Sequence, residues 1–200
     1  MTVTIGLEGV SCVGKTTLAR EIAQRLDAAV VACYYHIAPD KTLLPPPDST
    51  TAAAQMAALT VLLQLEQHRY RLVQNTASPV VILDRTVDTL LAHAHAVGRR
   101  HGYDCDDHAR QLALSQQIVV PELTLLLTAG DEDRERRAAR RVGMPTLFYA
   151  PDFTRDFNAY FTHPLASRVV VLDTSGDDTT TTVADHALQI VADHLTASVR

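Results

Sequence analysis

Residues 9–16 have the types and the spacing of a loop that binds phosphate. Their sequence, Gly-Val-Ser-Cys-Val-Gly-Lys-Thr, matches the Walker A pattern G-x-x-x-x-G-K-[ST]. Glycines at both ends permit positive φ angles, so that successive backbone N–H groups can point inward at a polyphosphate. Lys15 would then reach the β- and γ-phosphates of ATP, and Thr16 would hold Mg²⁺. The expected nucleotide-binding residues of this phosphate loop are Gly9, Ser11, Cys12, Val13, Gly14, Lys15, Thr16 and Thr17.

The segments on both sides of the phosphate loop favour this interpretation over a chance glycine-rich turn. Residues 3–7 form an apolar run that is typical of a buried strand. Residues 17–26 carry leucine and isoleucine at i, i+4 and i+8, which is the spacing of one helix face. The chain has only two lysines, Lys15 and Lys41. Because the chain otherwise uses arginine as its basic residue, a lysine at this position indicates a chemical role for its side chain.

Asp84 and Arg85 follow a second apolar run, for which a buried strand over residues 79–84 is predicted. An acid at the end of such a strand could hold Mg²⁺ or accept a proton from an attacking hydroxyl. Asp84 could instead cap the helix that is expected to begin near residue 86. The next residue is Arg85, whereas a motor ATPase usually carries a second acid that activates water. The Asn-Lys-x-Asp motif of GTPases does not occur in the chain.

Five of the sixteen arginines fall within eight residues, on a helix predicted over residues 131–141. They are Arg134, Arg136, Arg137, Arg140 and Arg141. Arg137 and Arg141 are spaced i, i+4 and would share a helix face, where they could stabilise a transferring phosphoryl group. Arg137 and Arg140 are also expected to contact ATP. The alternative is a solvated helix with local pairs to nearby acids, which accounts best for Arg134 and Arg136.

Composition limits the possible partners and compartments. A net charge of −5 disfavours a nucleic-acid partner, and no apolar run approaches the roughly 20 residues of a membrane span. Three cysteines without metal-like spacing fit a reducing cytoplasm, and the chain enters its first strand without a signal peptide. The length of 200 residues predicts one domain over residues 1–200, with a mobile lid at about residues 131–150.

Strands and helices alternate along the chain. Strands are predicted at residues 3–7, 30–33, 79–84, 122–127 and 168–173, and helices at 17–26, 51–76, 86–101, 107–119, 131–141, from 151 onward and at 179–197. This order predicts an α/β fold with a mostly parallel five-stranded sheet and helices on both faces. Ligands of such folds bind at the carboxyl ends of the strands.

Several residues could bind the molecule that accepts the phosphoryl group. Tyr34, Tyr35 and His36 follow the second strand and could stack on a ring or bond to a sugar, or could be ordinary edge packing. Gln64 and His68 share one helix face and could read a base, but a solvated polar face would look the same.

Two further sets of side chains have open interpretations. His93 and His95 lack a third ligand at a sensible spacing, so we expect them to be packed or solvated and not metal-bound. Met56, Leu59 and Leu63 could belong to the core or to a two-fold interface.

These signals, in this order, resemble the thymidylate kinase-like and deoxynucleoside kinase branch of the phosphate-loop kinases. The similar segments are residues 7–17, 62–69, 83–86, 121–127 and 171–176, which span most of the chain. The resemblance implies that Arg85 grips the phosphate of the acceptor and that Arg69 faces the bound nucleotide. It also implies that Arg137 is the first lid arginine, that the loop after the last strand packs on adenine, and that the protein is a homodimer.

The chain departs from thymidylate kinases in the part that would bind the acceptor. Ser11 stands where those enzymes usually carry an aspartate, and residues 34–39 replace an Arg-Glu-Pro-Gly-Gly stretch. Leu65 stands where an aromatic side chain stacks on thymine. The part that would bind the phosphate donor is the better matched of the two.

The sequence thus favours ATP-dependent phosphoryl transfer to a nucleoside monophosphate. Arg85 and Arg69 would hold the monophosphate. Lys15 and the lid arginines Arg137 and Arg141 would stabilise the transferred group, while Asp84 and Thr16 organise Mg²⁺. An alternative is a kinase for a hydroxyl of a nucleoside or another small metabolite, with Asp84 or Glu8 as the base. A third reading is a regulatory nucleotide-binding module.

Overall fold

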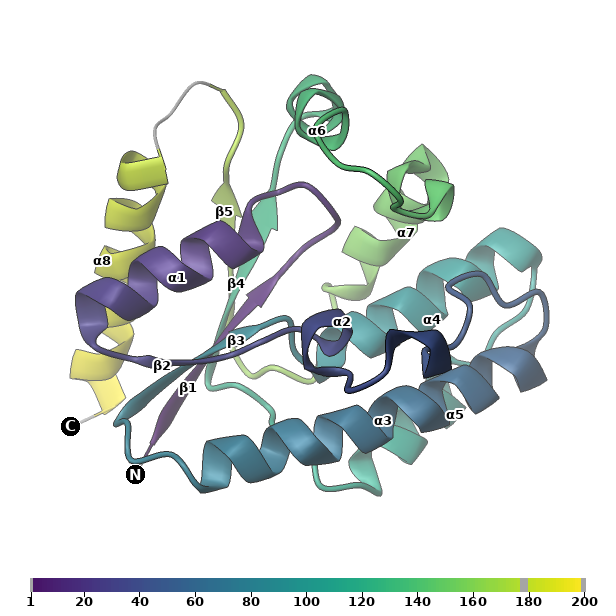
Figure 1. Ribbon diagram of the computed structural model, residues 1–200, viewed down its shortest axis with the longest axis horizontal. Helices are drawn as coiled ribbons and strands as arrows, with labels where there is room; N and C mark the ends of the chain where they lie inside the picture. Colours follow the sequence, from purple (N-terminus) through teal and green to yellow (C-terminus); the bar gives the residue numbers. More distant parts are fainter. Residues whose placement is uncertain (1, 177–179, 199–200) are drawn as a thin grey trace.

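The computed structural model describes residues 2–176 and 180–198, which form one five-stranded sheet in the order β2-β3-β1-β4-β5 (Figure 1). The strands are β1 (Val3–Glu8), β2 (Ala29–Val31), β3 (Val80–Asp84), β4 (Leu123–Thr128) and β5 (Val169–Asp173). Every neighbouring pair is parallel. The predicted α/β fold with a parallel five-stranded sheet is confirmed.

Helices cover both faces of the sheet. They are α1 (Lys15–Leu26), α2 (Tyr34–Ile37), α3 (Ala52–Gln74), α4 (Val87–His101), α5 (Asp106–Leu114), α6 (Asp131–Ala138), α7 (Pro151–Tyr160) and α8 (Thr180–Ser198), with short 3-10 turns η1 (Lys41–Leu43) and η2 (Thr146–Tyr149). Figure 1 shows α1 and α8 together on one side and α3, α4, α5 and α7 on the other. The phosphate loop and α6 lie at the carboxyl edge, opposite the chain ends.

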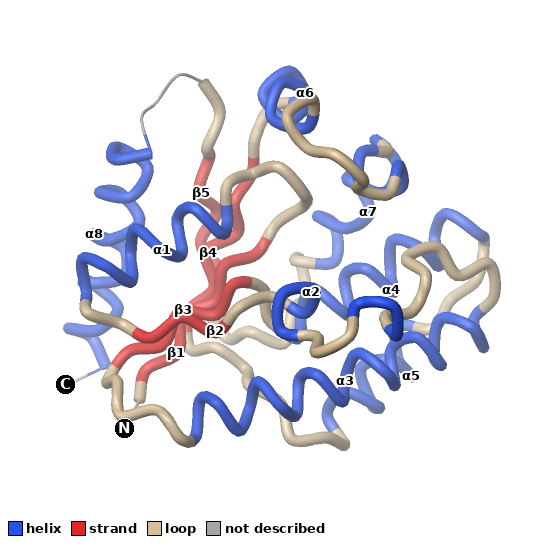
Figure 2. Tube along the Cα trace, viewed as in Figure 1, coloured by secondary structure: helices blue, strands red, loops and turns tan. Residues whose placement is uncertain are grey.

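The three central strands of the sheet consist almost entirely of apolar residues. β1, β3 and β4 are buried along nearly their whole length, as both-face coverage by helices requires (Figure 2). The register pairs Leu7 of β1 with Asp84 of β3 and Glu8 of β1 with Leu126 of β4. The acids at the ends of β1 and β3 are therefore brought together beside the phosphate loop.

A second apolar cluster fills the space among α3, α4 and α5. Leu59 and Leu63 are only 1% and 2% exposed within it, and Met56 packs against them. Of the two interpretations of this face, the structure supports the core, because side chains buried inside one chain cannot form a two-fold interface.

Three predicted boundaries were wrong. The strand β2 ends at Val31, two residues before the predicted end, and α5 ends at Leu114, five residues earlier than expected; residues 34–37, for which no element was predicted, form the short helix α2. Helix α6 ends at Ala138, so Arg140 and Arg141 lie beyond it. Thr179, the predicted start of the last helix, lies outside the described residues.

None of the helices within the described ranges combines the length and the apolar character needed to cross a bilayer.

Candidate active site

The phosphate loop adopts backbone angles that its glycines make possible. Gly9 and Gly14 have φ angles of 126° and 97°. A Cβ on Gly9 would lie 2.2 Å from the carbonyl oxygen of Leu127, so no side chain fits there. Cys12 also has a positive φ, 68°, which is uncommon for a residue with a side chain. The shape of the loop therefore depends on its positive φ angles and on the close approach of Gly9 to β4.

Lys15 lies inside the phosphate loop that it is expected to serve. Its side chain is only 6% exposed, and Nζ donates hydrogen bonds to the carbonyl oxygens of Gly9 (2.7 Å) and Val10 (2.6 Å). Burial, together with the nearby Arg85 cation, holds the pKa of Lys15 well below its usual value, although Glu8 and Asp84 oppose the shift. A negatively charged phosphate oxygen beside Nζ would stabilise the charged form of Lys15.

Thr16 and Asp84 meet at the junction of α1 and β3. The Thr16 hydroxyl donates a 2.7 Å hydrogen bond to Oδ2 of Asp84. Hydroxyl and carboxylate oxygens are the ligands that Mg²⁺ prefers, so the donor set fits this ion. Both expected metal-binding residues are thus brought together. Asp84 does not cap α4, because Thr86 fills that position and accepts a hydrogen bond from the backbone N–H of Asp88.

Glu8 is fully buried and is occupied by protein donors. Its Oε1 accepts hydrogen bonds from the backbone N–H (2.6 Å) and the hydroxyl (2.8 Å) of Thr86, and its Oε2 accepts one from the Thr89 hydroxyl. Burial raises the pKa of Glu8, while these hydrogen bonds and Arg85 lower it. Glu8 therefore fixes the first turn of α4, which contradicts the expected role as a base.

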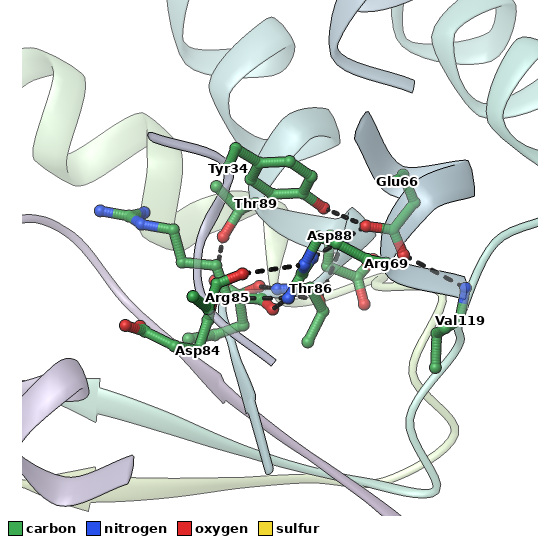
Figure 3. Close-up of polar contacts among 11 residues, drawn as sticks. Tyr34, Glu66, Arg69, Asp84, Arg85, Thr86, Asp88, Thr89 and Val119 are labelled. Atoms are coloured by element: carbon green, nitrogen blue, oxygen red, sulfur yellow. Dashed lines mark hydrogen bonds and ion pairs between the residues drawn. The ribbon is translucent and has the colours of Figure 1, made fainter. Parts of the chain in front are cut away.

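Arg85 presents a guanidinium to the carboxyl edge of the sheet. Its φ angle of 71° is left-handed, and its backbone N–H donates to the carbonyl of Leu7 at 3.0 Å. The register of β1 and β3 pairs Leu7 with Asp84 and so places Arg85 beside the phosphate loop, where its charge acts on the pKa values of both Lys15 and Glu8. Figure 3 shows the side chain extended, and within residues 2–176 and 180–198 no hydrogen bond or ion pair reaches its guanidinium.

Arg69 is buried and does not present donors to a nucleotide. Its Nε donates to the carbonyl of Ala32 (3.1 Å), Nη1 to Glu66 (2.8 Å) and Nη2 to the carbonyl of Arg85 (2.5 Å). The Tyr34 hydroxyl donates to Glu66 at 2.7 Å. These contacts contradict the expected substrate-binding roles of Arg69 and Tyr34, because every polar group involved faces the protein.

Gln64 and His68 on α3, which could read a base or form a solvated face, lie on the exposed side of the helix. Gln64 and His68 are exposed, whereas Glu66 and Arg69 are buried on the opposite side of the helix. Solvation was thus the correct interpretation of Gln64 and His68. Sequence reasoning missed Glu66, although a Glu-x-x-Arg pair inside an apolar helix was the available signal.

Two of the expected acceptor-binding residues lie on the exposed surface of α2. Tyr35 is 55% exposed, and its ring stands edge-on to His36. Nζ of Lys41 lies 4.4 Å from the centre of the Tyr35 ring. These side chains are available to a ligand at the edge of the sheet.

His93 and His95 lie in different surroundings on α4, since His93 is packed and Nδ1 of the partly exposed His95 lies 2.6 Å from Asp106. His93 packs against the rings of Phe148 and Phe153, with centroids 6.1 and 5.7 Å away. Burial and the Arg85 cation lower the pKa of His93 to about 4, although a hydrogen bond to the Pro47 backbone opposes the shift. Among the described residues, no three potential ligands are grouped to hold a metal.

The five clustered arginines on and after α6 divide into three groups. Arg137 joins the phosphate loop to the loop after β5, because Nη1 donates to the carbonyl of Cys12 (3.3 Å) and Nη2 to that of Thr174 (2.6 Å). Arg134 and Arg136 form the expected local ion pairs with acids of the same helix, but Arg134 is buried and also donates to the Thr154 hydroxyl, so it does not lie on a solvated face. Arg140 and Arg141 are exposed beyond the helix end, so the face that Arg137 and Arg141 were expected to share does not form.

Solved structures of two kinases share this fold. The thymidylate kinase of Candida albicans is 17% identical with a TM-score of 0.71, over 96% of this chain and 92% of that one. The deoxyadenosine kinase of M. mycoides, bound to dCMP and dCDP, is 12% identical with a TM-score of 0.69, over 96% and 100%. The resemblance to the fold of these phosphate-loop kinases is confirmed. None of the curated proteins compared with the sequence matches it.

A family model described as an AAA domain matches residues 4–151. The match includes the phosphate loop, Asp84 and Arg85, and the whole of α6. It covers well over half of the 200 residues. The chain therefore belongs to the AAA domain family, on a parallel sheet that it shares with nucleotide and nucleoside kinases.

Proposed function

We propose that this protein transfers the γ-phosphoryl group of ATP to a nucleoside monophosphate. The observation that carries the proposal is the guanidinium of Arg85, which lies near Lys15 and makes no hydrogen bond or ion pair with the described residues. Arginine matches phosphate oxygens with paired donors, so this group suits an acceptor that brings its own negative charge.

The donor half of the site supports this proposal. Backbone N–H groups of the phosphate loop and the Lys15 ammonium would bind the phosphates of ATP. Thr16 and Asp84 would hold Mg²⁺, which would neutralise charge on the transferred group. Arg137 bridges the phosphate loop and Thr174, where its guanidinium could contact a nucleotide bound in the loop.

The acceptor half favours phosphate over a hydroxyl. A hydroxyl acceptor needs a base, and the nearby carboxylates of Glu8, Glu66 and Asp88 each accept hydrogen bonds from protein donors on both oxygens. Asp84 already accepts the Thr16 hydroxyl. A phosphate oxygen is a nucleophile without a base, so positioning and charge suffice.

The names of the two structurally similar kinases point to nucleotide and nucleoside substrates. One is named a thymidylate kinase, and the other is a deoxyadenosine kinase bound to its products dCMP and dCDP. By analogy we include in the proposal a single domain over residues 1–200 with a lid near 131–150, a homodimer and a cytoplasmic location.

An acceptor panel tests this function. ADP release from Mg²⁺·ATP is measured with each nucleoside monophosphate, nucleoside and deoxy form, in the wild type and in Arg85→Ala. We expect one monophosphate to stimulate release strongly and the substitution to remove that stimulation. Arg99→Ala is the matched control, because Arg99 is an exposed arginine on α4, the helix that begins two residues after Arg85.

Two results would contradict the proposal. Stimulation by unphosphorylated compounds alone would identify a hydroxyl kinase with Asp84 as the remaining base. No stimulation by any compound would favour a regulatory nucleotide-binding module.

A further inference from the structure

A buried set of three side chains connects α2 with Arg85 (Figure 3). It begins at Tyr34, whose hydroxyl donates to Oε2 of Glu66 at 2.7 Å and whose ring lies over the Arg69 guanidinium at 4.6 Å. Burial and the adjacent Glu66 raise the pKa of Tyr34 well above its usual value. The hydroxyl therefore stays protonated and remains a donor at neutral pH.

Glu66 is the shared acceptor at the centre of this set. Its Oε2 accepts both the Tyr34 hydroxyl and Nη1 of Arg69 at 2.8 Å, and its Oε1 accepts the Val119 backbone N–H at 3.2 Å. The side chains of Glu66 and Arg69 are each 1% exposed. A buried ion pair is sensitive to the loss of any partner, because the remaining charge is left without compensation.

Arg69 ends the set at the backbone of Arg85. Nη2 donates to the Arg85 carbonyl at 2.5 Å and more weakly to that of Asp84 at 3.4 Å. The left-handed φ angle of Arg85, 71°, is unfavourable for a residue with a side chain and persists only where the surroundings hold it. The Arg69 hydrogen bond is one of the contacts that hold it.

We propose that Tyr34, Glu66 and Arg69 are positioning residues, which link the placement of α2 to the conformation of Arg85. The helix α2 also carries Tyr35 and His36, the exposed side chains on the acceptor side. The contact of an acceptor with α2 and the capture of its phosphate by Arg85 are then coupled, and the coupling acts equally in both directions. The role assigned to Arg85 rests on the proposed function.

The test uses two substitutions in the full chain that spare Arg85 itself. Tyr34→Phe removes one hydroxyl, and Glu66→Gln removes one charge while keeping an acceptor. Tyr103→Phe is the matched control, since it also deletes a tyrosine hydroxyl with a 2.8 Å hydrogen bond, to the carbonyl of Ser49. Near-UV circular dichroism confirms that each variant is folded.

Two readouts are measured in each variant. Hydrogen exchange of the Arg85 and Thr86 amides reports the conformation of this backbone. Modification of Arg85 by phenylglyoxal, followed by mass spectrometry, gives the concentration of inorganic phosphate that protects the guanidinium by half. A role confined to stability would leave this phosphate concentration unchanged.

We expect exchange at both amides to accelerate in Tyr34→Phe and Glu66→Gln. We expect the half-protecting phosphate concentration to rise about 3- to 10-fold, while Tyr103→Phe behaves as the wild type. The proposal is overturned if either readout stays at the wild-type value in Tyr34→Phe, or if Tyr103→Phe shifts both equally. If phosphate fails to protect Arg85 even in the wild type, the proposed function is contradicted, and hydrogen exchange alone decides the linkage.

Discussion

The side chain of Lys15 lies in surroundings that disfavour its positive charge. Burial and Arg85 lower its pKa, and its hydrogen bonds go to neutral carbonyl oxygens of the phosphate loop. An anion that enters between Lys15 and Arg85 stabilises both cations at once. We therefore expect the two cations to attract phosphate, with part of the binding energy coming from relief of their mutual repulsion.

Lys15→Ala tests this residue directly. We expect phosphoryl transfer to fall by about 100-fold or more, because the substitution removes a preorganised cation from the transferred group. The fold should persist, since the freed carbonyls of Gly9 and Val10 can bond to water. ADP release and circular dichroism measure the two effects. Lys41→Ala is the control, and activity that survives in Lys15→Ala would refute the phosphate-loop assignment.

His93 makes stability depend on acid pH. Its pKa is about 4 in the folded protein against a usual 6.5, because burial and Arg85 disfavour its charged form. Between these two values the unfolded chain binds more protons, so stability is lost as pH falls from about 6.5 to about 4, by at most about 3 kcal/mol. Urea unfolding at several pH values should show this loss in the wild type and a smaller loss in His93→Phe. Equal losses in both proteins would exclude His93 as the cause.

At the scale of elements, the phosphate loop depends on its contact with β4. Gly9→Ala should destabilise the protein by about 2 kcal/mol or more and abolish ATP binding, because the new Cβ would meet Leu127 at 2.2 Å on a backbone with a φ of 126°. Gly102→Ala has a positive φ without any such contact, and we expect a loss of about 1 kcal/mol there. Thermal unfolding and ATP titration compare them. Equal losses would show that backbone strain alone matters.

The elements that the sequence predicts well are those with continuous local signals. The apolar runs before the phosphate loop and before Asp84 identify buried strands, and the parallel sheet follows from their alternation with helices. Helix α2 has no such signal, because four residues are held there by docking of Tyr34 onto Glu66, which lies 32 positions away. The end of α6 was similarly missed, since the chain turns at Ala138 without a breaker until Gly143.

Side-chain roles on α3 were harder to predict than the helix itself. A charged residue inside an apolar helix reads as solvated unless its partner is known. Arg69 finds its partners in Glu66 and in carbonyls of the segments that follow β2 and β3, while Gln64 and His68 face outward. Only the packing of α3 against the end of β3 selects between these two faces.

At the scale of the whole molecule, Arg137 ties α6 to the phosphate loop and to the loop after β5. Because this contact lies across the expected nucleotide site, ATP should bind more weakly in Arg137→Ala. Wild-type stability should rise by about 2.7 kcal/mol when ATP reaches 100 times its dissociation constant, and by less in the variant at the same concentration. Arg20→Ala, an exposed arginine of α1, is the control. Equal stabilisation of Arg137→Ala and the wild type would remove Arg137 from the site.

The scarcity of lysine gives the molecule a built-in attachment point. Lys15 is buried and bonded within its loop, whereas Lys41 is exposed and lies over the ring of Tyr35. An amine-reactive dye in aqueous buffer would therefore couple to Lys41 and to the terminal amine, without any engineered cysteine. Such a dye would stand beside α2, where its fluorescence would report ligand arrival at this edge of the sheet.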